Sequence, residues 1–308
     1  MKAFFKLIRY QNLLIIALMQ IIVHYGFFKF QSIALALNDW QYALLVIATV
    51  LIAAAGYVIN DVFDQDTDEI NKPEKVIIGK YISETKAYNI YVTLNIIGVA
   101  IAFYLSNAVE KPTLSGIFIG VAALLYLYAS SLKQSLLIGN FIVAIIAAVS
   151  ILVVGIFDLY PVLNPENRIF FGSQFLVLMD YAMFCFIISL FREIIKDAED
   201  FNGDNAMGMR TLPIVLGISK TTKIVLGASI IFIAYLLFYV YQNYFTFDLY
   251  FGAAYTLLTI IAPMIYFSIQ LWTAKTKEDF SHLSKILKLV LFFGVLLILV
   301  IALNIKYA

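Results

Sequence analysis

Nine long apolar runs follow one another along the chain, and they limit its possible folds more than any other feature. An α-helix needs about 20 apolar residues to cross roughly 30 Å of hydrocarbon. Hydrophobic residues make up 63% of the 308 positions and charged residues only 13%, which is more apolar surface than a soluble protein of this size can cover. The runs lie at residues 12–34, 43–59, 88–106, 114–129, 136–157, 170–190, 224–240, 251–272 and 286–305.

These runs predict an all-α, polytopic integral membrane protein with about nine transmembrane helices, built as a single transmembrane domain over residues 1–308. Cys185 is the only cysteine and falls within the sixth run. An intrachain disulfide is therefore impossible, and a metal site based on thiolates is not expected. Membrane lipid is the expected surrounding, and no nucleic-acid partner is predicted.

The basic residues are unevenly distributed between the two ends of the predicted helices. Most of the 21 Lys and Arg residues lie in the N-terminal segment and in the loops after the second, fourth, sixth and eighth runs. Basic loops stay in the cytoplasm, so the N-terminus and these loops are predicted to be cytoplasmic. Most of the 20 Asp and Glu residues lie there too. A face that only met anionic lipid would not gather carboxylates, so this face is predicted to carry chemistry.

The first acidic cluster follows the second run and reads Asn60-Asp61-Val-Phe-Asp64-Gln-Asp66-Thr-Asp68. If the helix continues outward, Asn60, Asp64 and Asp68 share one face, and Asp61 lies beside them.

A second acidic cluster follows the sixth run, where Asp197, Asp200 and Asp204 also share one helical face. Like charges this close repel unless a cation neutralises them. Oxygen ligands without His or Cys indicate a hard cation, and Mg²⁺ is the predicted cofactor. One such cluster could equally be solvated loop charge, but two clusters at corresponding ends of spans favour a functional site.

The chain also shows signs of an internal repeat. The two clusters stand four spans apart, and segment 74–83 after the first is similar to segment 212–219 after the second. We therefore predict two pseudo-repeated four-helix halves, at about 1–135 and 136–272, and a last helix at about 284–305. The clusters are predicted to face each other across the bundle, since ligands of membrane proteins commonly bind at repeat interfaces.

At these residues the sequence resembles the UbiA superfamily of intramembrane prenyltransferases, with similarity from the first run to Gly217. The family's NDxxDxxxD and DxxxD motifs are matched by Asn60, Asp61, Asp64 and Asp68, and by Asp200 and Asp204. Segments 56–61, 126–133 and 192–213 are most similar to the digeranylgeranylglyceryl phosphate synthases, which attach a second polyprenyl chain to a glycerol-phosphate ether. The resemblance implies a UbiA-like fold and prenyltransferase activity.

The resemblance also implies the substrates. They are a prenyl pyrophosphate, of geranylgeranyl type, and a lipophilic acceptor, the free hydroxyl of a prenylglyceryl phosphate. Metal ions held by carboxylates would stabilise pyrophosphate as it leaves. The predicted metal ligands are Asn60, Asp61, Asp64, Asp68, Asp197, Asp200 and Asp204. The predicted catalytic residues are Asp64, Asp68, Asp200, Asp204 and Lys133.

A further set of residues is predicted to bind the substrates. Basic side chains would bind the pyrophosphate, and tyrosine rings would stabilise the allylic cation. The set is Arg9, Asn60, Lys75, Tyr126, Tyr128, Asn140, Arg192, Lys196 and Arg210. For Arg9 and Arg210 a positive-inside anchor is the simpler alternative. Packing is the alternative for the tyrosines, and an interhelical hydrogen bond is the alternative for Asn140.

Two other functions are compatible with the sequence. The first keeps the fold but changes the acceptor to an aromatic ring, as in quinone or haem side-chain prenylation. Pro73-Glu-Lys75-Val stands where relatives commonly have Pro-x-Arg-Pro, so the first cytoplasmic loop leaves the acceptor open. The second is an ion-coupled transporter, which the mid-span Asp180 would suit. A transporter would place its charges at mid-membrane, whereas both clusters flank spans, which favours an enzyme.

Overall fold

The computed structural model describes residues 2–74 and 76–307. These residues form helices and no β-strand, and nine of their helical segments are long and apolar enough to cross a membrane. The segments are Tyr10–Gln31, Asp39–Phe63, Glu84–Ala108, Pro112–Ser130, Ile138–Val162, Arg168–Glu199, Ile218–Phe245, Tyr250–Thr273 and Lys277–Tyr307. The predicted all-α, polytopic architecture with nine spans is therefore confirmed.

The chain divides into two compact units. Unit 1 contains the residues up to Ile21 together with Ala34–Ala182, and unit 2 contains Ile22–Ile33 together with Met183–Ala308. The first span and the long helix α8 are each divided between the two units.

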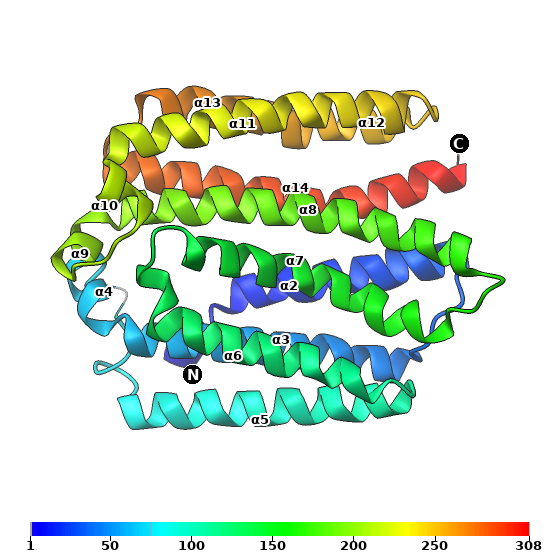
Figure 1. Ribbon diagram of the computed structural model, residues 1–308, viewed down its shortest axis with the longest axis horizontal. Helices are drawn as coiled ribbons and strands as arrows, with labels where there is room; N and C mark the ends of the chain where they lie inside the picture. Colours follow the sequence, from blue (N-terminus) through cyan, green and yellow to red (C-terminus); the bar gives the residue numbers. More distant parts are fainter. Residues whose placement is uncertain (1, 75, 308) are drawn as a thin grey trace. The chain divides into compact units, whose positions relative to one another are not determined.

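Unit 1 carries the first acidic cluster. Its helices are α1 (Lys2–Leu7), α2 (Tyr10–Ile21), α3 (Asp39–Phe63), α4 (Gln65–Asn71), α5 (Glu84–Ala108), α6 (Ser115–Ser130), α7 (Ile138–Asp158) and the first half of α8 (Arg168–Glu199). Single 3₁₀ turns are η3 (Pro112–Leu114), η4 (Leu132–Gln134) and η5 (Tyr160–Val162). Helices α3, α5 and α6 lie side by side (Figure 1).

Close helix contacts in unit 1 depend on glycine. A Cβ atom on Gly56 of α3 would lie 2.9 Å from two carbons of Leu125 in α6, and one on Gly98 of α5 would lie 2.9 Å from Ile52 in α3. Small residues let membrane helices approach closely and gain van der Waals contact. Helix α3 is therefore held tightly between its neighbours, which fixes the position of the acidic segment at its end.

A buried apolar cluster lies beneath that acidic segment. It joins α1, the end of α3, the loop after α4, the start of α5 and the end of α6. Its members are Leu7, Val58, Ile59, Val62, Ile78, Ile82, Ala87 and Ala129. The loop turns back at Gly79, which has φ +80° and whose amide donates to the Ile82 carbonyl at 2.9 Å. This turn places two isoleucines in the cluster and supports the acidic segment from below.

The buried Gln20 of the first span makes three hydrogen bonds within unit 1. Gln20 Nε2 donates to Thr49 Oγ1 at 3.2 Å and to the Ser150 carbonyl at 3.0 Å, and the Tyr42 hydroxyl donates to the Gln20 carbonyl. Such bonds link α2, α3 and α7, because a polar group in hydrocarbon is costly unless it is hydrogen-bonded.

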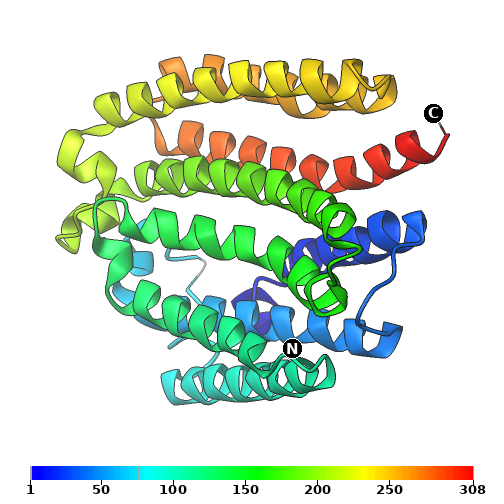
Figure 2. The same cartoon turned by 45° about the vertical axis from the view of Figure 1, so that its right-hand side comes forward.

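Unit 2 carries the second acidic cluster. Its elements are η1 (Ile22–Phe28, a π-helical segment), η2 (Lys29–Gln31), the second half of α8, α9 (Phe201–Ala206), α10 (Leu212–Leu216), α11 (Ile218–Val240), η6 (Tyr241–Phe245), α12 (Tyr250–Thr256), η7 (Leu257–Ile261), α13 (Ala262–Thr273) and α14 (Lys277–Tyr307). Helices α11 and α13 lie side by side, and α14 runs next to α13 (Figures 1 and 2).

Helix α14 packs against both α8 and α12 within unit 2. A Cβ atom on Gly294 would lie 2.3 Å from the ring of Phe184 in α8, and one on Gly252 of α12 would lie 2.3 Å from Ile301. The amide of Gly252 donates to Asn304 Oδ1 at 3.0 Å. The last span is therefore an integral part of unit 2 and lies directly against the helix that leads to the second acidic cluster.

Candidate active site

The first acidic corner, residues 60–68, contains a break between two helices. Helix α3 ends at Phe63, Asp64 has φ −95° and ψ 2°, and α4 begins at Gln65. Helical hydrogen bonding nevertheless continues: the Asp64 amide donates to the Asn60 carbonyl at 2.9 Å, and the Asp68 amide donates to the Asp64 carbonyl at 2.8 Å. Asn60, Asp64 and Asp68 therefore stay one helical turn apart, although the chain bends at Asp64.

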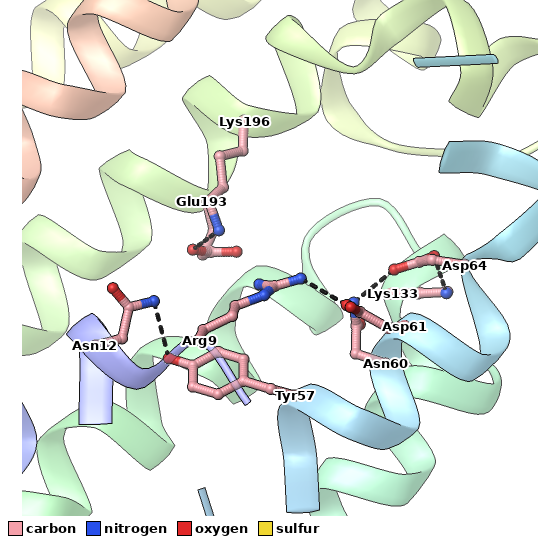
Figure 3. A network of polar contacts seen from close by, with 9 residues as sticks. All are labelled: Arg9, Asn12, Tyr57, Asn60, Asp61, Asp64, Lys133, Glu193 and Lys196. Atoms are coloured by element: carbon pink, nitrogen blue, oxygen red, sulfur yellow. Dashed lines mark hydrogen bonds and ion pairs between the residues drawn. The ribbon is translucent and has the colours of Figure 1, made fainter. Parts of the chain in front are cut away.

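Two side chains bind the Asp64 carboxylate in this corner. It accepts a hydrogen bond from Asn60 Nδ2 at 2.6 Å and forms an ion pair with the ammonium group of Lys133 (Figure 3). The side chains of Lys133 and Asp64 are only 9% and 18% exposed, so their attraction is screened less than that of a surface pair. Lys133, a predicted catalytic residue, is thus brought to the corner from 69 positions further along the chain.

A glycine sets the position of Lys133. The lysine lies in the 3₁₀ turn η4, directly before α7. A Cβ atom on Gly139 would lie 2.8 Å from the Lys133 Cα, 2.9 Å from the Leu132 carbonyl oxygen and 3.2 Å from the Tyr128 ring. Backbone atoms cannot move aside as a flexible side chain can, so only glycine allows α7 to start this close to the turn. Tyr128, a predicted substrate-binding residue, packs at the same place.

Arg9 reaches the corner from the turn between α1 and α2. Its Nη2 donates to Asp61 Oδ1 at 3.0 Å, and its guanidinium carbon lies 4.9 Å from the centre of the Tyr57 ring. The Tyr57 hydroxyl in turn accepts a hydrogen bond from Asn12 Nδ2 at 3.3 Å (Figure 3). Arg9 has φ +50°, a left-handed conformation that costs a non-glycine residue roughly 1–2 kcal/mol. These two tertiary contacts hold Arg9 against the last turns of α3.

The charge of Arg9 is secured by its surroundings. Burial alone would lower the pKa of Arg9, but the negative charge of Asp61, with smaller contributions from Tyr57 and Asp64, raises it above its usual value. Arg9 is therefore cationic at every physiological pH.

The second acidic corner, residues 197–204, has the same local form. Helix α8 ends at Glu199, Asp200 has φ −96° and ψ 10°, and the short α9 follows. The Asp200 amide donates to the Lys196 carbonyl at 2.8 Å, and the Asp204 amide donates to the Asp200 carbonyl at 3.1 Å. The predicted helical spacing of the carboxylates is preserved here as well, and Asp204 is buried.

Glu193 is a charged residue that the sequence analysis did not select. It is buried in α8 and accepts from Arg192 Nη1 at 3.0 Å. It also accepts from Lys196 Nζ at 3.0 Å, the contact that Figure 3 draws. Its position three residues before Lys196 is a spacing that pairs side chains on a helix. The spacing of Glu193 and Lys196, in a span with few other charges, could have indicated this ion pair from the sequence.

The other predicted residues lie at separate places in the two units. The Tyr126 ring packs edge-on against Phe63 with centroids 5.9 Å apart. Asn140 is buried in the first turn of α7, and Arg210 is exposed between α9 and α10. Lys75 lies outside the described residues.

The donor set of each corner suits a hard cation. Among the described residues, no group of three or more His, Cys, Asp or Glu side chains is arranged to hold a metal ion by itself. Mg²⁺, however, usually takes one or two carboxylates and completes its octahedron with water and substrate phosphate. The corners offer only carboxylate and amide oxygens, which fits this preference. In the first corner Arg9 and Lys133 offset part of the like-charge repulsion that the sequence predicted a metal would have to offset alone.

The nine-span helical fold and the carboxylate corners agree with an integral membrane prenyltransferase, which the family match shows. The family model described as the UbiA prenyltransferase family matches residues 21–296, and the chain belongs to that family. This assignment decides between the two classes of function that the sequence allowed, in favour of the enzyme and against a transporter. Asp180, which suited a transporter, is exposed on α8.

Several proteins show the same likeness in more detail. The curated digeranylgeranylglyceryl phosphate synthase of Saccharolobus solfataricus is 34% identical over 225 residues, which cover 73% of this chain and 72% of the relative. The fold resembles that of a structure solved in a study of digeranylgeranylglyceryl phosphate synthase in membranes, with TM-score 0.64 and 24% identity over 98% of both chains. It also resembles a UbiA homologue from Archaeoglobus fulgidus bound to GPP and Mg²⁺, with TM-score 0.60 and 13% identity over 96% and 99% of the two chains.

Proposed function

We propose that this enzyme transfers a geranylgeranyl-type group from its pyrophosphate ester to the free hydroxyl of a prenylglyceryl phosphate, in a Mg²⁺-dependent reaction at the cytoplasmic membrane surface. The observation that carries the proposal is the first acidic corner, where Lys133 and Arg9 converge on the carboxylates of Asp64 and Asp61 at the end of a membrane span. Carboxylates for a metal ion and cations for an anion, placed next to hydrocarbon, suit an amphiphilic pyrophosphate.

The relatives support the choice of substrates. The synthases of Saccharolobus solfataricus and Sulfurisphaera tokodaii, at 34% and 31% identity, match about three quarters of this chain, and their name specifies a glyceryl phosphate product. The Archaeoglobus fulgidus homologue is described with a prenyl pyrophosphate and Mg²⁺. These likenesses favour a prenylglyceryl phosphate over an aromatic ring as the acceptor.

The proposed reaction exchanges one C–O bond for another. The bond between C1 of the prenyl chain and the pyrophosphate oxygen breaks, and the acceptor oxygen bonds to C1. The hydroxyl proton passes to the departing pyrophosphate or to water, so an ether and pyrophosphate are the products. Mg²⁺, when bound, supplies positive charge to the leaving group. Its proposed ligands are Asn60, Asp61, Asp64 and Asp68 in the first corner, and Asp197, Asp200 and Asp204 in the second.

Individual residues have separate roles in this proposal. Lys133 has three N–H donors, so it can bind a pyrophosphate oxygen while it keeps its bond to Asp64. Arg9 holds Asp61 and stays charged, and Lys75 and Arg210 are proposed to bind the same anion. Tyr126 and Tyr128 are proposed to face the allylic cation, and Asn140 to line the prenyl cavity.

Substrate competition tests the proposal directly. Purified protein in lipid vesicles is given geranylgeranyl pyrophosphate with either a prenylglyceryl phosphate or a hydroxylated aromatic acid, with Mg²⁺ or with EDTA. We expect turnover of the glyceryl phosphate only, and only with Mg²⁺. Turnover of the aromatic acid alone would overturn the acceptor assignment, and full activity in EDTA would overturn the role of the metal.

The cytoplasmic orientation has its own test. A chain in which Cys185 is replaced by serine can carry a single new cysteine at Lys6, in α1, or at Glu166, in the loop before α8; both positions are exposed. In intact cells we expect a membrane-impermeant maleimide to label Glu166→Cys and to leave Lys6→Cys unlabelled. The reverse pattern would overturn the orientation.

A further inference from the structure

Two cations share one buried carboxylate near the end of α8, in unit 2. The buried carboxylate of Glu193 accepts from both Arg192 and Lys196, each at 3.0 Å. Burying charged groups near hydrocarbon is costly unless a function requires them.

Arg192 presents a free edge of its guanidinium group. Its Nη1 is used by Glu193, and its Nε is buried and has no hydrogen-bond partner among the described residues. Nε and Nη2 form the side-on fork of an arginine, and this fork matches two oxygens of a phosphate or carboxylate. Glu193 therefore fixes one edge of the arginine and leaves the other for an anion.

Helix α14 adds a third cation to this place. Lys288 lies close enough to Arg192 for their positive charges to repel each other, and α14 packs on α8 through Gly294 and Phe184. Arg192 and Lys288 thus bring two like charges close together. A phosphate monoester carries about −1.5 to −2 at pH 7 and would offset the repulsion between them.

The acceptor of the proposed reaction carries such a monoester, in addition to the pyrophosphate of the donor. A carboxylate corner repels a phosphate unless a metal ion intervenes, so the acceptor phosphate needs cations of its own. Arg192 lies eight residues before Asp200, or about 12 Å along an α-helix, so Arg192 stands apart from that aspartate along α8, whereas Lys196 lies next to Asp197.

We propose that Arg192, Lys196 and Lys288 bind the phosphate group of the acceptor, and that Glu193 is a positioning residue that orients Arg192 and Lys196. This inference rests on the proposed function, because it takes the acceptor to be a phosphate monoester. It assigns Arg192 and Lys196 to the acceptor rather than to the pyrophosphate that the sequence analysis favoured.

Steady-state kinetics in vesicles separate the two substrates. The acceptor is either the prenylglyceryl phosphate or the corresponding prenylglycerol, which lacks the phosphate, and acceptor and donor are varied in turn. For Arg192→Gln and Lys288→Met we expect the acceptor KM to rise about 10- to 100-fold, the range for a lost charged hydrogen bond. The preference for the phosphorylated acceptor should fall by the same factor, while the donor KM changes by less than about 3-fold.

Two further variants serve as controls. Lys285→Met removes an exposed lysine one turn earlier on α14 and should leave both KM values within about 2-fold. Lys288→Arg keeps the charge and should retain most of the preference, so a loss in Lys288→Met cannot be attributed to misfolding.

Different results overturn different statements. A rise in donor KM with unchanged acceptor preference would assign these cations to the pyrophosphate and overturn the inference. Unchanged kinetics in Arg192→Gln and Lys288→Met would reduce the group to a structural ion pair. Failure of the wild-type protein to use a prenylglyceryl phosphate would instead overturn the proposed function, before any variant is measured.

The sign of one effect tests the role of Glu193. Glu193→Gln removes a negative charge, so simple electrostatics predicts tighter binding of the phosphate and a lower acceptor KM. If Glu193 orients the two cations, the acceptor KM rises instead, by about 10-fold, with little change in donor KM. A lower acceptor KM would contradict the positioning role.

Discussion

The two acidic corners share their backbone geometry and differ in the residues that precede their middle aspartates. In each corner the helix is interrupted at the middle aspartate, with φ −95° at Asp64 and −96° at Asp200, and a short helix follows. The carboxylates have the same spacing in both corners: Asp61, Asp64 and Asp68 in the first, Asp197, Asp200 and Asp204 in the second.

The corners differ at the helix positions before the middle aspartate. Four residues before it, the first corner has Asn60, which donates to Asp64, and the second has Lys196, which pairs with Glu193. Seven residues before it, the first corner has Tyr57, whose ring lies against Arg9, and the second has Glu193. Identical carboxylate spacing is therefore combined with different partners.

The contacts described around the two corners join residues at different separations along the sequence. At the first corner, Asp61 and Asp64 draw in cations from α1–α2 and from the turn after α6, 52 and 69 residues away. At the second, Glu193 is paired by residues one and three positions away on its own helix. We infer that changes at the first corner affect both fold and activity, because its contacts join separate elements of unit 1.

Replacing the middle aspartates should give the largest effects. Asp64→Asn and Asp200→Asn each remove a proposed metal ligand of nearly the same size, and we expect kcat to fall by roughly 100-fold or more. Asp66→Asn, an exposed neighbour in the first corner, should keep near-normal kcat. The measurement is Mg²⁺-dependent prenyl transfer. Gel filtration in detergent checks that each variant is folded. Full activity in either middle-aspartate variant would remove that corner from the site.

The Lys133–Asp64 pair should show the next largest effect. Lys133→Met leaves a mostly buried carboxylate without its lysine, so we expect kcat to fall about 10- to 100-fold and the protein to lose roughly 1–3 kcal/mol of stability. Lys86→Met, at an exposed lysine of α5, is the control and should change neither quantity. A double-mutant cycle with Asp64→Asn measures the coupling. Additive losses of stability would show that the pair does not hold the corner together.

Much of this arrangement could be predicted from the sequence. The apolar runs predicted nine spans because hydrocarbon thickness sets helix length, and the spacing of Asn60, Asp64 and Asp68 survives the break at Asp64. The opposed clusters and the two pseudo-repeated halves stay predictions. The contact of Arg9 with Asp61 could not be derived, because it depends on a left-handed residue in an ordinary-looking turn. Glu193 could not be singled out by motif, because it precedes the acidic motif at 197–204 and its burial depends on the packing of α8.

A substitution at Gly139 tests whether tertiary packing holds the first corner in place. Gly139→Ala places a methyl group 2.8 Å from the Lys133 backbone, so the turn carrying Lys133 must shift. We expect a loss of roughly 1–3 kcal/mol and about 10-fold lower kcat. Gly116→Ala, in α6, meets nothing within 4 Å and should be neutral or slightly stabilising. Thermal unfolding and turnover are measured for both variants. Equal stability and equal kcat in Gly139→Ala and Gly116→Ala would show that Lys133 is positioned by other contacts.

The turns that follow the corners should give the smallest effects and test whether the two regions are supported alike. Gly79 and Gly217 have φ +80° and +81°, where a side chain is strained, and Gly217, with ψ 152°, lies in a region used almost only by glycine. Neither has an atom within 3.4 Å of an added Cβ, so the cost comes from the backbone alone.

We expect Gly79→Ala and Gly217→Ala each to lose roughly 1–2 kcal/mol of stability, with less than about 3-fold change in kcat. Gly227→Ala, which adds a methyl group in open space on α11, should lose none. A much larger loss of activity in Gly79→Ala than in Gly217→Ala would show that the loop beneath the first corner positions its carboxylates, and that the two corners differ in support as well as in charge.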